Sequence, residues 1–317
     1  MIEIRNLSKR FGAFTAVDDV SFQVQPGEVL GFLGPNGAGK STTMKMITGF
    51  LAASQGSVEV CGSNVEQDPR AVKARIGYLP EGAPLYPDMT PESLLHFVGE
   101  MRGLSGAKLK ARIQEVVDLV HLEGVRHQRI ETLSKGFKRR VGLAQAIVHD
   151  PEVLILDEPT DGLDPNQKHE VRTLIRDMAA GKVIVLSTHI LEEVESVCTR
   201  AIIIAKGRMC FDGTPAELRK RSAYFNAVAL TVKTDQDISG SLTALAGVAR
   251  VEETGSADGH KSYMLFPADG QAILRAVGDH AHEAGLEVEH LHVEKGRLDE
   301  VFRTITQEEA GASAPAK

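Results

Sequence analysis

Residues 29–41 read VLGFLGPNGAGKS. The aliphatic run Val29–Leu33 predicts a short buried strand, and the apolar spacing from Lys40 to Leu51 predicts a helix. Between them, Gly34–Ser41 fits the pattern GxxxxGK[ST], in which a glycine-rich turn joins a strand to a helix around a phosphate group. Because the flanking strand and helix are the context that this mechanism requires, we predict a nucleotide site rather than a chance glycine-rich turn.

Each position of this loop has a physical task. Gly37 and Gly39 allow the tight turn that brings backbone N–H groups up to phosphate oxygens. The helix that begins at Lys40 directs the positive end of its dipole toward the same anion. We expect Lys40 to reach the β- and γ-phosphates of ATP and Ser41 to bind Mg²⁺. The predicted nucleotide-binding residues of the loop are Gly34, Pro35, Asn36, Gly37, Ala38, Gly39, Lys40, Ser41 and Thr42.

Two acidic residues follow a second aliphatic strand. Val153–Leu156 leads directly into Asp157 and Glu158. The end of a strand places Asp157 at the sheet edge near the phosphates, where its carboxylate can bind Mg²⁺. Glu158 is the candidate general base for the attacking water. Two acids after a strand are often only surface residues, but their presence with a P-loop in one chain favours the catalytic interpretation.

Strand-like and helix-like segments alternate through the first two thirds of the chain. Val183–Leu186 and Ala201–Ala205 are aliphatic throughout, which is typical of central strands in a parallel sheet covered by helices. From about residue 90 to 149 apolar residues recur at helical spacing, which predicts a helical insertion. We therefore predict an α/β fold for residues 1–221.

A different pattern follows. Residues 222–308 show strand alternation from Val228, then a helix from about Gly270 to Ala284 and a last helix from Leu298 to Ile305, which together predict a small α+β domain. Residues 309–317 are rich in Ala, Gly and Ser, and we expect them to be disordered.

Composition narrows the class of protein. The 317 residues carry a formal net charge of −7, which disfavours a general nucleic-acid binder. Cys61, Cys198 and Cys210 lie far apart and predict reduced thiols rather than a zinc site. The N-terminus lacks the apolar core of a signal peptide, and no apolar run approaches the ~20 residues that span a bilayer. We expect a cytosolic chain that needs another protein to hold it at a membrane.

The region from about Ile2 to Leu218 resembles the nucleotide-binding domain of ABC transporters. Its matching features are, in chain order, Phe11 at the position of the adenine-stacking aromatic, Gly34–Ser41 as Walker A, Glu81 at the Q-loop, Leu133-Ser134-Lys135-Gly136-Phe137 as the signature, Asp157 and Glu158 as Walker B with the catalytic glutamate, Gly162-Leu163-Asp164 as the D-loop, and Ser187-Thr188-His189 with the switch histidine. The resemblance implies a P-loop NTPase with an antiparallel β subdomain and a helical subdomain at about 90–149.

The resemblance also implies a mechanism. Two such domains face each other head to tail, so that Ser134 and Gly136 of one subunit contact the ATP bound by Lys40 of the other. His189 contacts the γ-phosphate, and Asp164 and Glu81 belong to the nucleotide site, with Glu81 also near Mg²⁺. The implied partners are a second ATPase subunit, in the simplest case an identical copy, and a separate polytopic permease. The chain would then lie on the cytoplasmic face of the inner membrane as the ATPase of an exporter.

Two motifs depart from the common family pattern. Glu81 stands where Gln is usual, and Lys135 and Phe137 replace a Gly and the Gln of the signature. We expect the charge of Lys135 to offset part of the charge of Glu81. Both departures resemble a subgroup of gliding-motility-type exporters and of the exporter used in nitrous oxide reductase maturation, within a branch that also serves drugs and polysaccharides.

The alternative function is a soluble ABC ATPase acting on nucleic acid or ribosomes. Such proteins commonly carry two nucleotide domains, long coiled coils or zinc motifs, and this chain has one nucleotide domain and neither addition. A structural subunit without hydrolysis is disfavoured because both Glu158 and His189 are present. Residues 222–308 resemble the accessory domain that follows ATPases of the drug and polysaccharide branch, where a role in dimer contact or regulation is implied.

Overall fold

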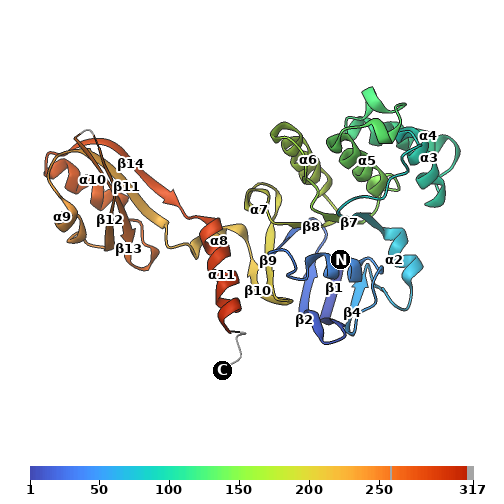
Figure 1. The fold of residues 1–317 in the computed structure, drawn as a ribbon, viewed down its shortest axis with the longest axis horizontal. Coiled ribbons are helices and arrows are strands. Elements are labelled where there is room, and N and C mark those ends of the chain that lie inside the picture. The colour runs from blue at the N-terminus through green and yellow to red at the C-terminus, as the bar shows by residue number, and fades with distance from the viewer. Residues whose placement is uncertain (258, 313–317) are drawn as a thin grey trace. The chain divides into compact units, whose positions relative to one another are not determined.

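The computed structural model describes residues 1–257 and 259–312 (Figure 1). Its contacts divide the chain into two compact units. Unit 1 is Met1–Pro215 together with the end of the last helix from Ile305, and unit 2 is Ala216–Thr304. The functional boundary between an ATPase domain and an accessory domain, expected near residue 221, remains a prediction.

A six-stranded sheet forms the centre of unit 1. Its strand order is β10-β9-β3-β8-β7-β6, and all neighbours are parallel except β10, which pairs antiparallel with β9. Every residue of β3 and β7 is buried, as expected for strands covered on both faces. The strands are β3 (Val29–Leu33), β6 (Ile76–Leu79), β7 (Val153–Asp157), β8 (Val183–Thr188), β9 (Arg200–Ala205) and β10 (Arg208–Gly213). Parallel pairing brings the carboxyl ends of β3, β7 and β8 to one edge.

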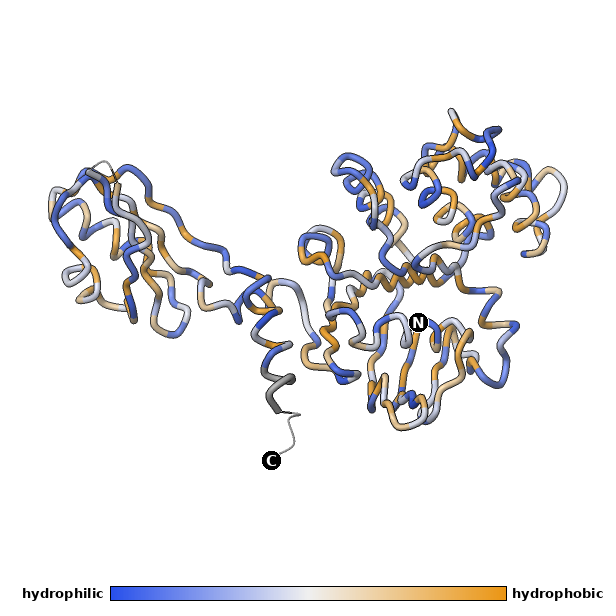
Figure 2. Tube along the Cα trace, viewed as in Figure 1, coloured by the Kyte–Doolittle hydropathy of each residue, from blue (hydrophilic) through white to orange (hydrophobic). Residues whose placement is uncertain are grey.

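An antiparallel sheet of order β2-β1-β4-β5 packs with this centre. One hydrophobic cluster joins the two sheets and helix α1 (Lys40–Ile47), and within it the rings of Phe22 and Phe32 lie 5.7 Å apart. Figure 2 shows hydrophobic colouring along the central strands and mixed colouring along the helices outside them. The strands of the second sheet are β1 (Ile2–Phe11), β2 (Phe14–Val24), β4 (Gln55–Val60) and β5 (Ser63–Asn64).

The predicted helical insertion is confirmed. Figure 1 shows α3 (Pro91–Met101), α4 (Gly106–Leu119) and α5 (Lys135–Ile147) grouped together. Helix α3 begins with a capping box in which Thr90 and Ser93 exchange hydrogen bonds, so its first backbone N–H groups are satisfied. The other helices of unit 1 are α2 (Pro69–Arg75), α6 (Pro165–Met178) and α7 (Leu191–Val197), with short 3₁₀ turns at Glu123–Val125 and Ile130–Thr132.

Unit 2 is the predicted α+β fold. Its four strands are antiparallel in the order β12-β13-β11-β14, and with α9 and α10 they form a β-α-β-β-α-β arrangement of the ferredoxin-like type. A core around Leu230, Tyr263 and Val277 joins the sheet to both helices. The elements after β10 are α8 (Pro215–Lys220), β11 (Phe225–Lys233), α9 (Ser239–Thr243), β12 (Val248–Ala257), β13 (His260–Pro267), a 3₁₀ turn (Ala268–Gly270), α10 (Leu274–Glu283), β14 (Glu287–Lys295) and α11 (Leu298–Ala312).

The last helix is longer than the sequence pattern predicts. Helix α11 continues past Ile305 to Ala312 and so includes the first residues of the segment expected to be a disordered tail. Gln307, Glu308 and Ala310 favour helical backbone, which explains the extension. The rest of that segment, residues 313–317, lies outside the described residues. Within the described part of the chain, every helix is too short or too polar to cross a bilayer.

Candidate nucleotide and hydrolysis site

The loop between β3 and α1 has a backbone that requires glycine at two points. Gly39 has φ +110°, and a Cβ atom there would lie 2.6 Å from the carbonyl oxygen of Ala16. At Gly34 an added Cβ would lie 2.4 Å from the carbonyl oxygen of Ile204. Because neither carbonyl can retreat without disturbing its strand or loop, any side chain at these positions would reshape the turn.

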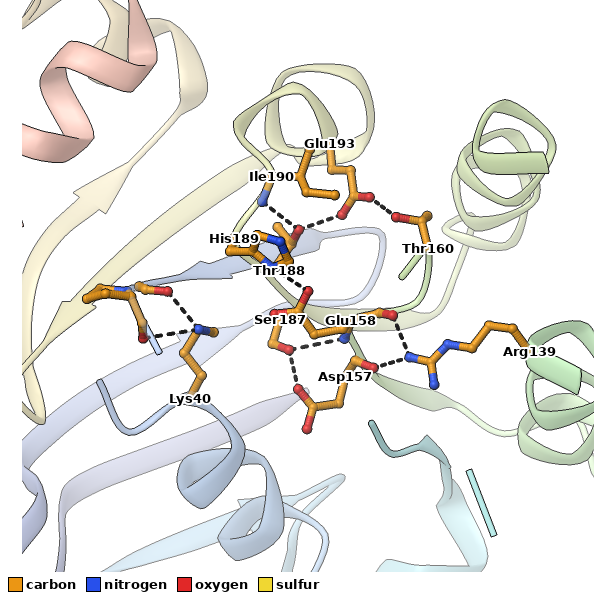
Figure 3. Close-up of polar contacts among 12 residues, drawn as sticks. Lys40, Arg139, Asp157, Glu158, Thr160, Ser187, Thr188, His189, Ile190 and Glu193 are labelled. Carbon is orange, nitrogen blue, oxygen red and sulfur yellow. Dashed lines mark hydrogen bonds and ion pairs between the residues drawn. The ribbon is translucent and has the colours of Figure 1, made fainter. Parts of the chain in front are cut away.

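Lys40 is folded back into this turn. Its side chain is buried, and Nζ donates hydrogen bonds to the carbonyl oxygens of Gly34 at 2.6 Å and Pro35 at 3.3 Å (Figure 3). Burial lowers the pKa of Lys40, while the charges of Glu158 and Asp157 raise it. The ammonium is therefore positioned at the loop, opposite two carboxylates.

Asp157 ends β7 next to Ser187 of β8, its register partner in the parallel pair. Asp157 is 2% exposed, and the Ser187 hydroxyl donates to its Oδ1. Among the described residues no hydrogen-bond donor contacts Oδ2. A buried carboxylate with one oxygen oriented by a serine and one oxygen free matches what a hard divalent cation requires of a ligand.

Glu158 and His189 are in hydrogen-bond contact with each other at this edge of the sheet. Glu158 Oε2 lies 2.7 Å from His189 Nδ1, and the Glu158 backbone N–H donates to Ser187 O at 3.1 Å. When Glu158 is ionised its carboxylate can only accept, and the contact then requires the proton on Nδ1 of His189. Burial raises the pKa of Glu158, and His189 opposes this shift. Glu158 also has φ +54°, a left-handed backbone that is rare for a residue with a side chain.

Phe11 lies apart from this cluster at the end of β1. Its side chain is 50% exposed, and Lys9 Nζ lies 5.2 Å from the ring centroid. An exposed ring at a strand end is able to stack on a planar base, whereas a core residue would be covered.

Ser134, Gly136 and Asp164 form a second group. Ser134 caps α5 by accepting from the Phe137 N–H, and Asp164 caps α6 by accepting from the Gln167 N–H. Gly136 lies so close to Gln167 that a Cβ atom would be 2.3 Å from its Oε1. Among the described residues, no hydrogen bond or ion pair joins these three residues to the phosphate loop.

Glu81 follows β6 and lines a groove of about 470 Å³. Lys135, Arg139 and Asp161 line the same groove, so Glu81 and Lys135, one residue from each departing motif, share one surface. The charge of Glu81 also raises the pKa of Lys40. These placements bring Glu81 into the electrostatic surroundings of the phosphate loop.

Arg139 of α5 was missed by sequence reasoning. Its guanidinium donates to four backbone carbonyls, those of Pro80, Asp157, Glu158 and Pro159. Figure 3 shows the guanidinium beside the ends of β7. One side chain therefore joins the signature helix to both the Q-loop and the acidic edge. An arginine in a basic helix turn carries no local signal for this role.

Sequence reasoning also missed the contacts of Glu193 with Thr160 and with Thr188, the residue before the switch histidine. All three are buried, and the two threonine hydroxyls donate to the Glu193 carboxylate. A signal was present for one of them, because Glu193 shares its helix face with Val194 and Val197, and an acid on an apolar face needs a partner.

Comparisons with known proteins show which proteins this chain is similar to. The family model described as ABC transporter matches residues 17–161. The Nod factor export ATP-binding protein I of Paraburkholderia xenovorans (strain LB400) is 42% identical over 218 residues, which is 68% of this chain and 72% of that protein. The linearmycin resistance ATP-binding protein LnrL of Bacillus subtilis (strain 168) is 32% identical over 307 residues, which is 96% of this chain and 98% of that protein.

Solved structures show the same fold. An ATP-binding subunit of an ABC transporter matches with a TM-score of 0.65 and 33% identity, over 70% of this chain and 92% of that one. The dimeric cassette MJ0796, bound to ADP and Pi, matches with a TM-score of 0.63 at 22% identity, over 68% of this chain and 99% of that one.

Proposed function

Because the chain belongs to the family of ABC transporter ATP-binding proteins of exporter-type systems, we propose that its ATPase activity drives a separate membrane permease. The observation that carries the proposal is the meeting of Lys40, Asp157, Glu158 and His189 at one edge of the central sheet. This edge combines a phosphate loop, a metal ligand and a base that could activate water.

Lys40 would bind ATP by exchanging its carbonyl partners for phosphate oxygens. The backbone N–H groups of the loop and the start of α1 would bind the same phosphates. Ser41 and Asp157 would hold Mg²⁺, with Glu81 as a further oxygen ligand in place of the usual amide. When bound, Mg²⁺ would neutralise charge on the β- and γ-phosphates.

Glu158 would orient the attacking water and accept its proton. Burial raises its pKa above the ordinary glutamate value, which makes the carboxylate a better proton acceptor. His189 already donates from Nδ1 to Glu158, so its Nε2 can donate to the γ-phosphate only while the ring is cationic. In this arrangement the imidazolium stabilises the charge that develops on the transferred phosphoryl group.

The signature residues would complete the site of a second copy. Ser134 and Gly136 lie at the first turn of α5, where a helix N-terminus favours anions, yet among the described residues no hydrogen bond joins them to their own phosphate loop. A head-to-tail dimer would place them on the partner's ATP, with Asp164 at the same seam. Loss of the γ-phosphate would remove the contact between copies and release the dimer.

Unit 1 also has a surface suited to a protein partner. Phe50 is 69% exposed and Met101 73% exposed, and both line a groove of about 740 Å³ together with Arg70, Lys73 and Arg102. Exposed large apolar side chains with a polar rim mark protein contacts more often than bare solvent surface. We assign this groove to a cytoplasmic segment of the permease, which would hold the chain at the inner membrane.

The cargo proposal rests on the relatives and on two residues. One relative is named for Nod factor export and another for linearmycin resistance, and we propose an exported cargo for this chain as well. Glu81 and Lys135 support the gliding-motility-type subgroup within this class, in which case the cargo belongs to a surface or motility system.

The test is affinity purification of tagged Glu158→Gln from detergent-solubilised native membranes with ATP present. This change should slow hydrolysis and retain the closed complex, and a multi-span membrane protein should be recovered. Glu152→Gln, at the exposed position just before the same strand, is the matched control and should retain wild-type turnover. Adding Phe50→Glu should abolish recovery of the membrane protein without weakening ATP binding. Recovery of ribosomes or nucleic acid alone would overturn the exporter proposal in favour of the soluble alternative.

A further inference from the structure

A buried carboxylate lies behind the hydrolysis site and has none of the roles above. Glu193 of α7 is 2% exposed. Its Oε1 accepts a hydrogen bond from Thr160 Oγ1, and its Oε2 accepts one from Thr188 Oγ1 at 2.6 Å (Figure 3). The carboxylate thus connects the loop after β7 with the end of β8.

Each threonine is adjacent to a proposed catalytic residue. Thr188 directly precedes His189, and its Oγ1 also accepts the Ile190 N–H at 3.0 Å, which closes the turn around the imidazole. Thr160 lies two residues after Glu158, in a turn where the Asp161 N–H donates to Glu158 O at 3.1 Å. Movement of either threonine would therefore displace Glu158 or His189.

The hydrogen bonds require an acceptor with two oxygens. Thr188 Oγ1 already accepts from a backbone N–H, so its own proton is directed to Glu193. An ionised carboxylate accepts from both hydroxyls, whereas an amide offers only one oxygen. Burial raises the pKa of Glu193, and the Thr188 hydrogen bond and Arg172 oppose this shift.

Stability alone is a poor reason for such a group. A buried charge is expensive to desolvate, and an apolar side chain of similar size commonly gives equal or better stability. Arrangements of this kind concentrate at functional sites, where orientation matters more than stability.

We infer that Glu193 is a positioning residue that holds the turn of His189 against the loop of Glu158, so that their 2.7 Å contact is formed before ATP binds. The inference rests on the catalytic roles proposed for Glu158 and His189. Hydrolysis depends on alignment within fractions of an ångström, so loosening this bridge should slow the chemical step while leaving ATP binding intact.

The first test compares ATPase kinetics of Glu193→Ala and Glu193→Gln with Glu192→Gln. Glu192 is the neighbouring acid on the same helix, is 74% exposed and pairs with Arg172. We expect kcat to fall by about tenfold or more in Glu193→Ala, with an intermediate loss in Glu193→Gln, and KM for ATP to change less than about twofold. For Glu192→Gln, both kcat and KM should stay within about twofold of the wild-type values.

A double-variant cycle separates positioning from a general structural effect. If Glu193 acts through His189, the variant carrying both Glu193→Ala and His189→Ala should be no slower than His189→Ala alone, within about twofold. The inference would be overturned if the kcat losses of the two single variants multiplied in the double variant, or if Glu193→Ala weakened ATP binding as much as it lowered kcat.

Thr160→Val and Thr160→Ser keep the test valid if Glu193→Ala does not fold. Valine matches the shape of threonine without its hydroxyl, and serine keeps the hydroxyl. We expect Thr160→Val to lose kcat and Thr160→Ser to retain most of it, and equal activity in the two would contradict the bridge. If Glu158→Gln and His189→Ala themselves hydrolyse ATP at the wild-type rate, the proposed function fails; if they are impaired and Glu193→Ala is not, only this inference fails.

Discussion

Glu158 combines a left-handed backbone with a half-buried carboxylate, and neither feature favours folding. The φ of +54° costs on the order of 1 kcal/mol for a residue with a side chain. The Ser187 carbonyl and the Arg139 guanidinium, which contact its backbone, hold it in place. Strain of this kind that is held by surrounding contacts is typical of a residue whose side chain must point in one direction.

The pH dependence of hydrolysis should follow the pKa of Glu158. A base works in its ionised form, so activity is lost as pH falls through its pKa, which burial raises above the ordinary glutamate value. His189 lowers this pKa, so His189→Gln should move the acidic limb of the kcat profile to higher pH. Stopped-assay ATPase rates between pH 5 and 9 would measure it on the residual activity. A limb that stays in place or moves to lower pH would contradict this assignment.

His149 should make folding stability depend on pH. Its Nε2 lies 3.1 Å from Ile76 O, Nδ1 has no hydrogen-bond partner among the described residues, and burial, followed by the charge of Arg102, lowers its pKa to about 4. The unfolded chain takes up this proton near pH 6.5, so stability is complete above that pH and is lost as pH falls toward 4.

Thermal denaturation between pH 7.5 and 5 would measure this effect. We expect the Tm of His149→Gln to fall less than that of the wild type over this pH range, because glutamine cannot take up a proton when the chain unfolds. His282→Gln, at an exposed position of α10, should keep the wild-type slope. An unchanged slope in His149→Gln would place the acid sensitivity in other groups.

Among the helices, α5 is joined to the acidic edge of the sheet by the hydrogen bonds of Arg139. Arg139 donates to the carbonyl of Pro80, the residue before Glu81, and to the carbonyls of Asp157 and Glu158. A shift of the helix that carries Ser134 would therefore also move the site of its own chain. This connection gives a physical route by which ATP bound in one site could affect the signature that faces a second copy.

Arg139→Leu should therefore be strongly destabilising. It leaves four carbonyl oxygens without their donor, and we expect a loss of roughly 2–4 kcal/mol of unfolding free energy, with Arg139→Lys recovering only part because an ammonium cannot match the planar guanidinium. Urea denaturation would measure it. Arg129→Leu, at a position whose side chain is 64% exposed, is the control and should cost less than about 1 kcal/mol. Equal losses in the two variants would remove Arg139 from this role.

At the scale of the whole molecule, the proposed site is complete only in a pair of chains. Within the described residues of one chain, no hydrogen bond or ion pair joins the helix start at Ser134 to the phosphate loop at Lys40. This separation is what a site shared between two copies requires, and it makes the dimer testable without a structure of the complex.

Mixing two inactive variants should restore hydrolysis. Lys40→Ala lacks the phosphate ligand and Ser134→Glu blocks the signature, so each alone should be inactive. In a mixed pair one of the two sites receives an intact Lys40 and an intact Ser134, and random pairing predicts up to about a quarter of wild-type turnover. Steady-state ATPase assays of the separate and mixed proteins would measure it. A mixture as inactive as its components would mean that the signature does not act across the dimer.

The phosphate loop, the buried parallel strands and the acids at the end of β7 follow from short stretches of sequence. Each depends on neighbours in the chain: glycines that permit a turn, aliphatic runs that need burial, and carboxylates directly after a strand. The predicted α/β fold with its helical insertion and second α+β part is accordingly confirmed.

How these parts are held together depends on contacts between segments that are far apart in the chain. Arg139 meets Pro80 from 59 positions away, and Glu193 meets Thr160 from 33 positions away. Residues of these types are common in helices, and nothing in their own segments distinguishes them from surface arginines and glutamates. Their roles come from burial beside carbonyl and hydroxyl groups of distant segments, because a buried polar group must find its partner wherever the packed chain places one.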